Sequence, residues 1–280
     1  MKSIIEYWYK RLEFPKEYDQ EFYQALEEIQ VCEGAKFEDY DLNETNGKKN
    51  LLYFLYFCEE LKEKYDVLGM PEEVMVATAK DIVNWCVIWS GVKGELCLYE
   101  ISWLKHHFSM LLFRLGRLQF CMGKSFCDIP EYNVKEGDNV MEIHIAEGPP
   151  LRYEDCLESI EMAKEFFAKY YPNFEYTCFT CYSWLMDQTL KSFLKEESNV
   201  VKFQKMFDIV KADADYSALR YVFGWDTTME NLKNAKADSS LSRSMKEYIL
   251  SGGKLYLGLG VIEKKDNFLK NTLQKTFIVV

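Results

Sequence analysis

Hydrophobic positions in the first hundred residues recur with the period of an α-helix. Apolar side chains lie three or four residues apart between positions 17 and 32, and again between 51 and 61. This spacing places them along one face of a helix. A third helix is predicted to begin at Pro71, where proline and two glutamates occupy the first turn, and to end near Gly91. The polar segment DYDLNETNGKK, residues 39–49, is predicted to be a loop.

The pattern changes after His107. In SMLLFRLGRLQFCM, residues 109–122, apolar side chains alternate in a way that favours a strand, with a bulge predicted at Gly116. We therefore predict a helical N-terminal domain over residues 1–107 and a second domain over residues 108–263. Residues 264–280, a charged segment that ends in FIVV, are predicted to be a tail.

Strands and helices alternate in the second domain. The pattern predicts a strand at 139–146, a helix at 153–171, a strand at 176–184, a helix from Ser239-Ser240 to Gly252-Gly253, and a strand in KLYLGLGVI (254–262). This order predicts an α/β (α+β) fold in which a mixed sheet has flanking helices. Asp187 is predicted to cap the helix that follows it.

Composition narrows the classes of function. A net charge of −11 without a Lys/Arg-rich run argues against a nucleic-acid partner. No long uncharged apolar stretch is present, so no membrane segment is predicted. Nine cysteines lie scattered along the chain, which is typical of a reduced compartment, and we expect a cytoplasmic protein. Cys178 and Cys181 have metal-like spacing, but no second pair completes a zinc site, and no metal is expected.

Five segments carry a resemblance to a known family. RLGRLQF (114–120), IHIAEGPPL (143–151), CYSWLMD (181–187), SNVVKFQKMF (198–207) and SSLSRSMKEYILSGG (239–253) resemble bacterial acyltransferase-domain proteins. In that family a helical N-acyltransferase-like N-terminal domain precedes a GNAT-like C-terminal domain. The resemblance implies a GNAT-like mixed sheet in which the strands at 139–146 and 176–184 splay apart. Acetyl-coenzyme A, or another acyl-coenzyme A, would be wedged between them as co-substrate.

The same resemblance assigns residues to the acyl donor. It implies that the donor is bound by Ile145, Ala146, Gly148, Arg152, Asn199 and Phe203. The turn nevertheless departs from the GNAT pattern, because Pro149 and Pro150 lack the N–H groups that bind pyrophosphate there. Glu154 and Asp155 also occupy the first turn of the predicted helix, where they repel a phosphate.

Alternation along residues 139–146 predicts which side chains face the cleft. Glu142 and His144 share one face, roughly 6 to 7 Å apart along the strand, and either is a candidate base. Tyr182 is a candidate acid for the leaving thiolate, and Cys181 with His144 is an alternative pairing of nucleophile and base. Candidate contacts to the substrate are Glu147, Ser183 and Trp184.

Two functions remain open from the sequence. The first is an acyl-coenzyme A-dependent N- or O-acyltransferase that acts on a small-molecule acceptor by direct attack on the thioester. The second is a catalytically inactive GNAT-like module that binds a ligand or a protein in the same cleft. The family pattern favours the first, and the Pro149-Pro150 turn favours the second.

Overall fold

The structure is a computed structural model, and it describes residues 1–265. These residues divide into one unit from Met1 to Arg114 and a second that begins at Leu115. The division lies inside strand β1 (Leu112–Leu115). Most of the predicted tail, including its apolar end FIVV, lies outside the described residues.

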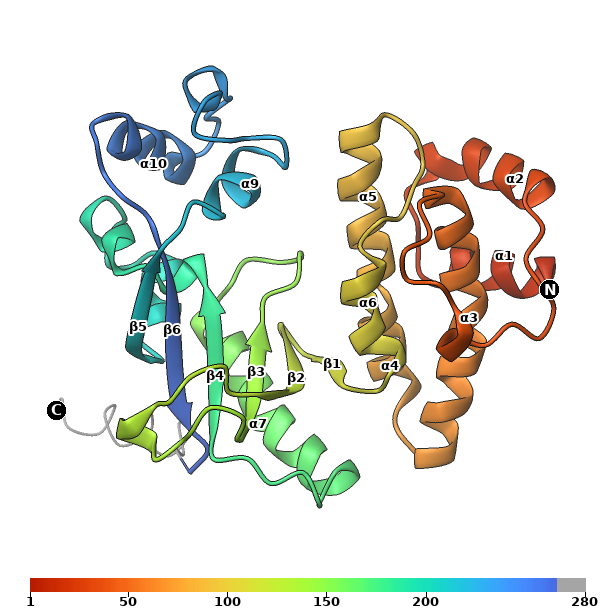
Figure 1. Ribbon diagram of the computed structural model, residues 1–280, viewed down its shortest axis with the longest axis horizontal. Coiled ribbons are helices and arrows are strands. Elements are labelled where there is room, and N and C mark those ends of the chain that lie inside the picture. The colour runs from red at the N-terminus through yellow and green to blue at the C-terminus, as the bar shows by residue number, and fades with distance from the viewer. Residues whose placement is uncertain (266–280) are drawn as a thin grey trace, which may run out of the picture. The chain divides into compact units, whose positions relative to one another are not determined.

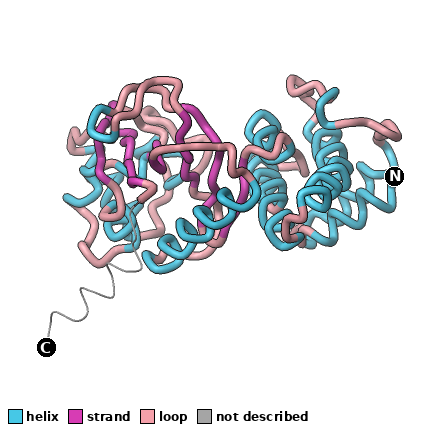
Figure 2. Tube along the Cα trace, turned by 90° about the horizontal axis from the view of Figure 1, so that it is seen from below, coloured by secondary structure: helices cyan, strands magenta, loops and turns pink. Residues whose placement is uncertain are grey.

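Helices joined by loops build the first unit (Figure 1, Figure 2). Helix α3 is its centre, because each of the other five named α-helices contacts it. Its apolar side chains face several directions and are buried by these neighbours. The helices are α1 (Lys2–Arg11), α2 (Asp19–Glu28), α3 (Gly47–Leu68), α4 (Glu72–Ala79), α5 (Asp81–Lys93) and α6 (Ile101–Phe108).

The single helix predicted from Pro71 to Gly91 is two helices, α4 and α5, with the break at Lys80. Thr78 turns its hydroxyl back to the carbonyl of Val74 at 2.7 Å, a bond that bends helices. Asp81, the first residue of α5, is buried and accepts hydrogen bonds from Trp103 Nε1 and His107 Nε2, both at 3.0 Å. These contacts with α6 are tertiary, so the hydrophobic period alone did not reveal the break.

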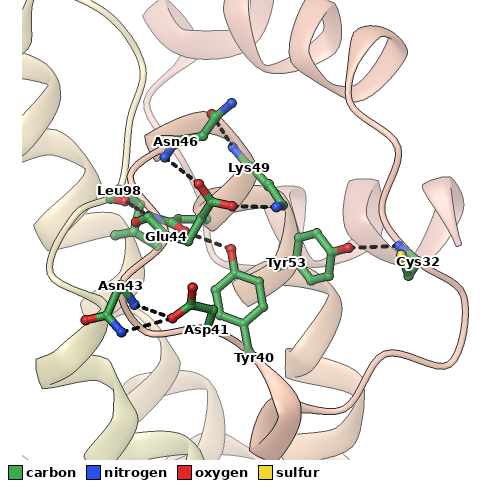
Figure 3. A network of polar contacts seen from close by, with 10 residues as sticks. Cys32, Tyr40, Asp41, Asn43, Glu44, Asn46, Lys49, Tyr53 and Leu98 are labelled. Atoms are coloured by element: carbon green, nitrogen blue, oxygen red, sulfur yellow. Dashed lines mark hydrogen bonds and ion pairs between the residues drawn. The ribbon is translucent and has the colours of Figure 1, made fainter.

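A buried amide holds the loop before α3 in place. Asn50 is 0% exposed, and its Oδ1 accepts a hydrogen bond from the hydroxyl of Tyr40 at 2.7 Å. Its Nδ2 donates to the carbonyl oxygens of Glu44 at 3.2 Å and Leu98 at 2.9 Å. Figure 3 shows these partners, which come from the loop before α3 and from the segment before α6. One side chain of α3 therefore holds both the loop before this helix and the distant segment before α6.

Six strands form one mixed sheet in the order β1-β2-β3-β4-β6-β5 within the described residues, and helices flank it (Figure 1). The predicted GNAT-like mixed sheet after a helical region is confirmed. The remaining strands are β2 (Leu118–Lys124), β3 (Asn139–His144), β4 (Cys178–Ser183), β5 (Asp208–Ala214) and β6 (Tyr256–Glu263). The helices are α7 (Tyr153–Tyr170), α8 (Asn199–Gln204), α9 (Ala218–Phe223) and α10 (Ser240–Leu250).

Gly116 is not a bulge but part of the two-residue turn that joins β1 to β2. Its φ of 67° lies in the left-handed region, which glycine adopts without strain. A Cβ at this position would also lie 2.7 Å from Ser159 Oγ on α7. The alternating apolar pattern runs through the turn, so it gave the appearance of one continuous strand.

Strands β3 and β4 are parallel and separate after a short pairing. Their pairs in the described sheet are Met141 with Phe179 and Glu142 with Thr180. Beyond this point β3 stays paired with β2 as far as His144, and β4 stays paired with β6 as far as Ser183. The predicted splay is therefore present, and it opens toward the carboxyl ends of both strands.

Three predicted helix boundaries are confirmed. Ser239 forms a capping box with Ser242 at the start of α10, and Gly252 follows its end with a φ of 97°. Asp187 accepts a hydrogen bond from Thr189 N at 2.8 Å and so caps a short 3₁₀ helix, Gln188–Ser192.

Several thiols are buried in apolar surroundings. Burial raises the pKa of Cys181 on β4 to about 12, and it does the same for Cys121 on β2 and Cys156 on α7. Each of these thiols is therefore protonated at neutral pH in the folded protein, whereas an unfolded chain ionises its cysteines near pH ~8.5.

We predict that Asn50→Ala lowers the free energy of unfolding by about 2 to 4 kcal/mol, because buried carbonyls lose their donor and a cavity remains. Urea unfolding followed by circular dichroism measures the loss. Asn43→Ala is the matched control, since Asn43 is exposed, and we expect a change within about 0.5 kcal/mol. Equal effects from the two substitutions would contradict the structural role of Asn50.

We predict that the protein loses stability as pH rises above about 9. The raised thiol pKa values mean that only the unfolded state releases these protons between pH ~9 and ~12, which favours unfolding. Each such thiol contributes a slope of at most about −1.4 kcal/mol per pH unit. Urea unfolding at several pH values should give a shallower slope for Cys181→Ala than for the wild type.

Candidate active site

A cavity lies where β3 and β4 separate. Its volume is about 180 Å³. Its lining comes from β3 and β4, from the end of β2 and the segment that follows it, and from β6. The lining residues are Lys124, Ser125, Phe126, Val140, Glu142, Ile143, His144, Thr180, Tyr182 and Leu259. Three of the predicted catalytic residues, Glu142, His144 and Tyr182, are therefore brought together by the fold.

Glu142 and His144 form a pair at this cavity. His144 Nε2 lies 3.2 Å from Glu142 Oε2, so the prediction that both share one face of the strand is confirmed. Their side chains are 35% and 31% exposed, which leaves them accessible while shielding them in part from solvent. When Nε2 carries the proton and donates it to the carboxylate, Nδ1 bears the lone pair and can accept a proton.

The carboxylate of Glu142 occupies space that a glycine leaves open. Gly123 on β2 pairs with Val140, two residues before Glu142, and a Cβ on Gly123 would collide with Glu142 Oε1 and Cδ. A glycine inside a strand weakens it, so its presence indicates that another group needs the space. Sequence reasoning missed this residue, because the collision depends on the register between β2 and β3.

Tyr182 already has a hydrogen-bond partner for its hydroxyl. The phenol donates to Asp213 Oδ2 on β5 at 3.1 Å, and its ring lies 4.8 Å from that of Phe126. Burial, and next the bond to Asp213, raises the pKa of Tyr182. The hydroxyl thus keeps its proton at neutral pH, but it must leave Asp213 to give that proton to a leaving group.

The turn between β3 and α7 holds four of the six residues assigned to the acyl donor. β3 ends at His144, so Ile145 and Ala146 belong to the turn and not to the strand as predicted. Glu147 and Gly148 are exposed within it. Arg152 makes two bonds to Asp155, from Nε at 2.8 Å and from Nη2 at 3.0 Å.

Arg117 fixes this turn and was not singled out from the sequence. Its Nε donates to the carbonyl oxygen of Pro149 at 2.7 Å, and its Nη1 donates to that of Ala146 at 2.9 Å. The residue stands in RLGRLQF, one of the segments that resemble the family. That resemblance is the only sequence signal that pointed to it, since its partners lie about thirty residues away.

The other predicted contacts lie outside the cavity lining. Ser183 Oγ accepts a hydrogen bond from Leu185 N at 3.2 Å, and the ring of Trp184 stacks on Tyr221 at 6.3 Å. Asn199 is exposed at the start of α8, while Phe203 is fully buried beside Phe207. Their roles toward donor and acceptor stay predictions.

The pairing of Cys181 with His144 as nucleophile and base is not supported. Cys181 is 0% exposed, and its raised pKa leaves almost no thiolate at neutral pH. Within residues 1–265, no group of three or more His, Cys, Asp or Glu side chains is arranged to hold a metal ion. In the same range no helix has the length and apolar character needed to cross a membrane.

Solved structures of acyltransferases share this fold. One, in complex with decanoyl-CoA and teicoplanin, is 19% identical with a TM-score of 0.72, over 91% of this chain and 86% of the other. A mutant in complex with octanoyl-CoA is 20% identical with a TM-score of 0.71, over 91% and 86%. A third, in complex with CoA and 10C-teicoplanin, is 23% identical with a TM-score of 0.68, over 77% of this chain and 66% of the other. No curated protein sequence matches the chain.

Two family profiles match the chain in succession. The family described as N-acyltransferase N-terminal domain matches residues 3–110, and the family described as GNAT-like C-terminal domain matches residues 112–262. The second match spans more than half of the 280 residues. The chain therefore belongs to the acyltransferase family in which an N-acyltransferase N-terminal domain is followed by a GNAT-like C-terminal domain.

Proposed function

We propose that this protein is an acyl-coenzyme A-dependent acyltransferase that transfers an acyl chain of medium length to an amine or hydroxyl of a small acceptor. The observation that carries the proposal is the Glu142–His144 pair at a cavity between splayed strands of a GNAT-like sheet. A base, an opening for a thioester and an apolar cavity occur together there. The acceptor is a small molecule, as teicoplanin is in two of the similar structures.

His144 acts as the general base in this proposal, and Glu142 orients it. The acceptor nitrogen or oxygen attacks the thioester carbonyl and loses a proton to Nδ1 of His144. The carbon–sulfur bond then breaks, and coenzyme A leaves as a thiolate that takes up a proton. Glu142 stabilises the imidazolium through the 3.2 Å contact. Tyr182, which lines the same cavity, is the candidate donor for the thiolate once its hydroxyl leaves Asp213.

The cavity supports a donor longer than acetyl. Apolar side chains of Phe126, Val140 and Leu259 line part of its wall. A cavity of about 150 Å³ holds benzene in other proteins, so about 180 Å³ suits a tail of roughly six to eight carbons. Similar acyltransferases have been solved with octanoyl-CoA and decanoyl-CoA. We therefore propose medium-chain acyl-coenzyme A as the preferred donor rather than acetyl-coenzyme A.

The turn before α7 is the expected position of the pyrophosphate. α7 is 18 residues long, and its first N–H groups and dipole favour an anion at this end. The bidentate bond from Arg152 neutralises Asp155, which removes part of the repulsion expected from the acidic first turn. Pro149 and Pro150 still contribute no N–H groups, so the binding-module alternative remains the second candidate.

We predict that His144→Ala lowers kcat by about 10²- to 10⁴-fold, the usual contribution of a general base, while the Kd for octanoyl-CoA changes less than about threefold. Release of coenzyme A thiol reports the rate with a panel of amine and hydroxyl acceptors that includes teicoplanin. His106→Ala, a histidine of the first unit, is the matched control. An unchanged kcat in His144→Ala would remove this residue as the base.

We predict that the affinity for acyl-coenzyme A rises with chain length from acetyl through butyryl to octanoyl. Each buried methylene contributes about 0.8 kcal/mol, or up to about fourfold in Kd. Calorimetric titration of the wild type measures the series, and the gain should stop once the cavity is full. A flat series would contradict an acyl-binding cavity. If none of these donors binds at millimolar concentration, the proposed acyltransferase function is rejected. The alternative, a catalytically inactive binding module, is then favoured.

A further inference from the structure

Arg117 lies beneath the turn that joins β3 to α7. It follows Gly116 in the hairpin between β1 and β2, and it is only 9% exposed. Its backbone N–H donates to Ser159 Oγ on α7 at 2.8 Å, and this bond fixes the backbone position from which the side chain extends. Its guanidinium then reaches the carbonyl oxygens of Ala146 and Pro149. One residue thus connects the hairpin, the turn and the helix.

These bonds determine which way the peptide groups of the turn face. In a trans peptide the C=O and N–H groups point in opposite directions, and the chain contains no cis peptide among its described residues. Because the carbonyl of Ala146 points toward Arg117, the N–H of Glu147 points away from it. The carbonyl of Pro149 is turned inward as well. Two oxygen atoms that would repel a phosphate are therefore directed away from the outer side of the turn.

The guanidinium of Arg117 also places a positive charge next to the turn, whose own cation, Arg152, is paired with a carboxylate. Arg152, the cation expected at this place, makes two bonds to Asp155 and is mostly exposed. Glu154 adds a negative charge in the first turn of α7. Arg117 carries a positive charge in a nearly buried position, where solvent screens it less than it screens Arg152. Pro149 and Pro150 restrict the backbone of the turn to few conformations, so the turn keeps one shape once Arg117 holds its carbonyls.

We propose that Arg117 is a positioning residue for coenzyme A, which holds the β3–α7 turn in the shape that accepts the pyrophosphate. This inference rests on the proposed function, because it assigns Arg117 to the same donor site. Arg117 orients the backbone of a turn in which Pro149 and Pro150 supply no N–H donors. It acts through the turn and not by contact with the reacting atoms.

The test compares two donors that differ in the part the turn would hold. Octanoyl-CoA carries the pyrophosphate and nucleotide, and octanoyl-pantetheine lacks both. We expect Arg117→Met to weaken binding of octanoyl-CoA about tenfold or more and to leave the Kd of octanoyl-pantetheine within about twofold. Calorimetric titration measures both values on the full chain. Arg243→Met is the matched control, since Arg243 also donates to backbone carbonyls before a helix, those of Ala237 and Asp238.

Arg117→Lys keeps the positive charge but cannot form both hydrogen bonds of the planar guanidinium. If Arg117→Met does not fold, this variant tests the positioning role in its place. We expect Arg117→Lys to weaken binding of octanoyl-CoA, but less than Arg117→Met does, and to leave binding of octanoyl-pantetheine unchanged. Equal losses for both donors, or no loss for either, would overturn the positioning role while leaving the proposed function in place. Failure of the wild type to bind either donor would instead reject the proposed function itself.

Discussion

The separation of β3 from β4 is the constraint on which the candidate site depends. Two parallel strands inside a sheet normally continue their ladder, since unpaired backbone groups cost free energy. Here each strand keeps its outer neighbour, so the sheet stays intact while its centre opens. The cavity, the Glu142–His144 pair and the turn before α7 all lie at this opening.

The features that sequence predicted well depend on local periodicity. Alternation along β3 identified Glu142 and His144 as neighbours on one face, because in a strand the side-chain period follows from the backbone alone. The helix caps at Ser239 and Asp187 were likewise readable, since a cap involves residues two or three positions apart. The order of strands and helices predicted a mixed sheet, and the resemblance supplied its splay.

The features that sequence did not predict depend on contacts between distant segments. Arg117 bonds to carbonyls about thirty residues away, and Gly123 makes room for Glu142 only in the observed register. The break between α4 and α5 follows from the contacts of Asp81 with α6. Gly116 illustrates the opposite error, in which a local pattern was interpreted too simply and a hairpin looked like one strand. The periodicity of a sequence contains no information on such pairs.

Gly123 also has a consequence for the motions of the sheet. A glycine inside a strand gives up more conformational entropy on folding than any other residue, and it adds no side chain to the packing. The ladder between β2 and β3 is therefore weakened near Glu142, and we expect its amide hydrogens to exchange with solvent more readily than those of a strand without a glycine. The residue that makes room for the carboxylate thus also loosens the sheet next to the candidate base.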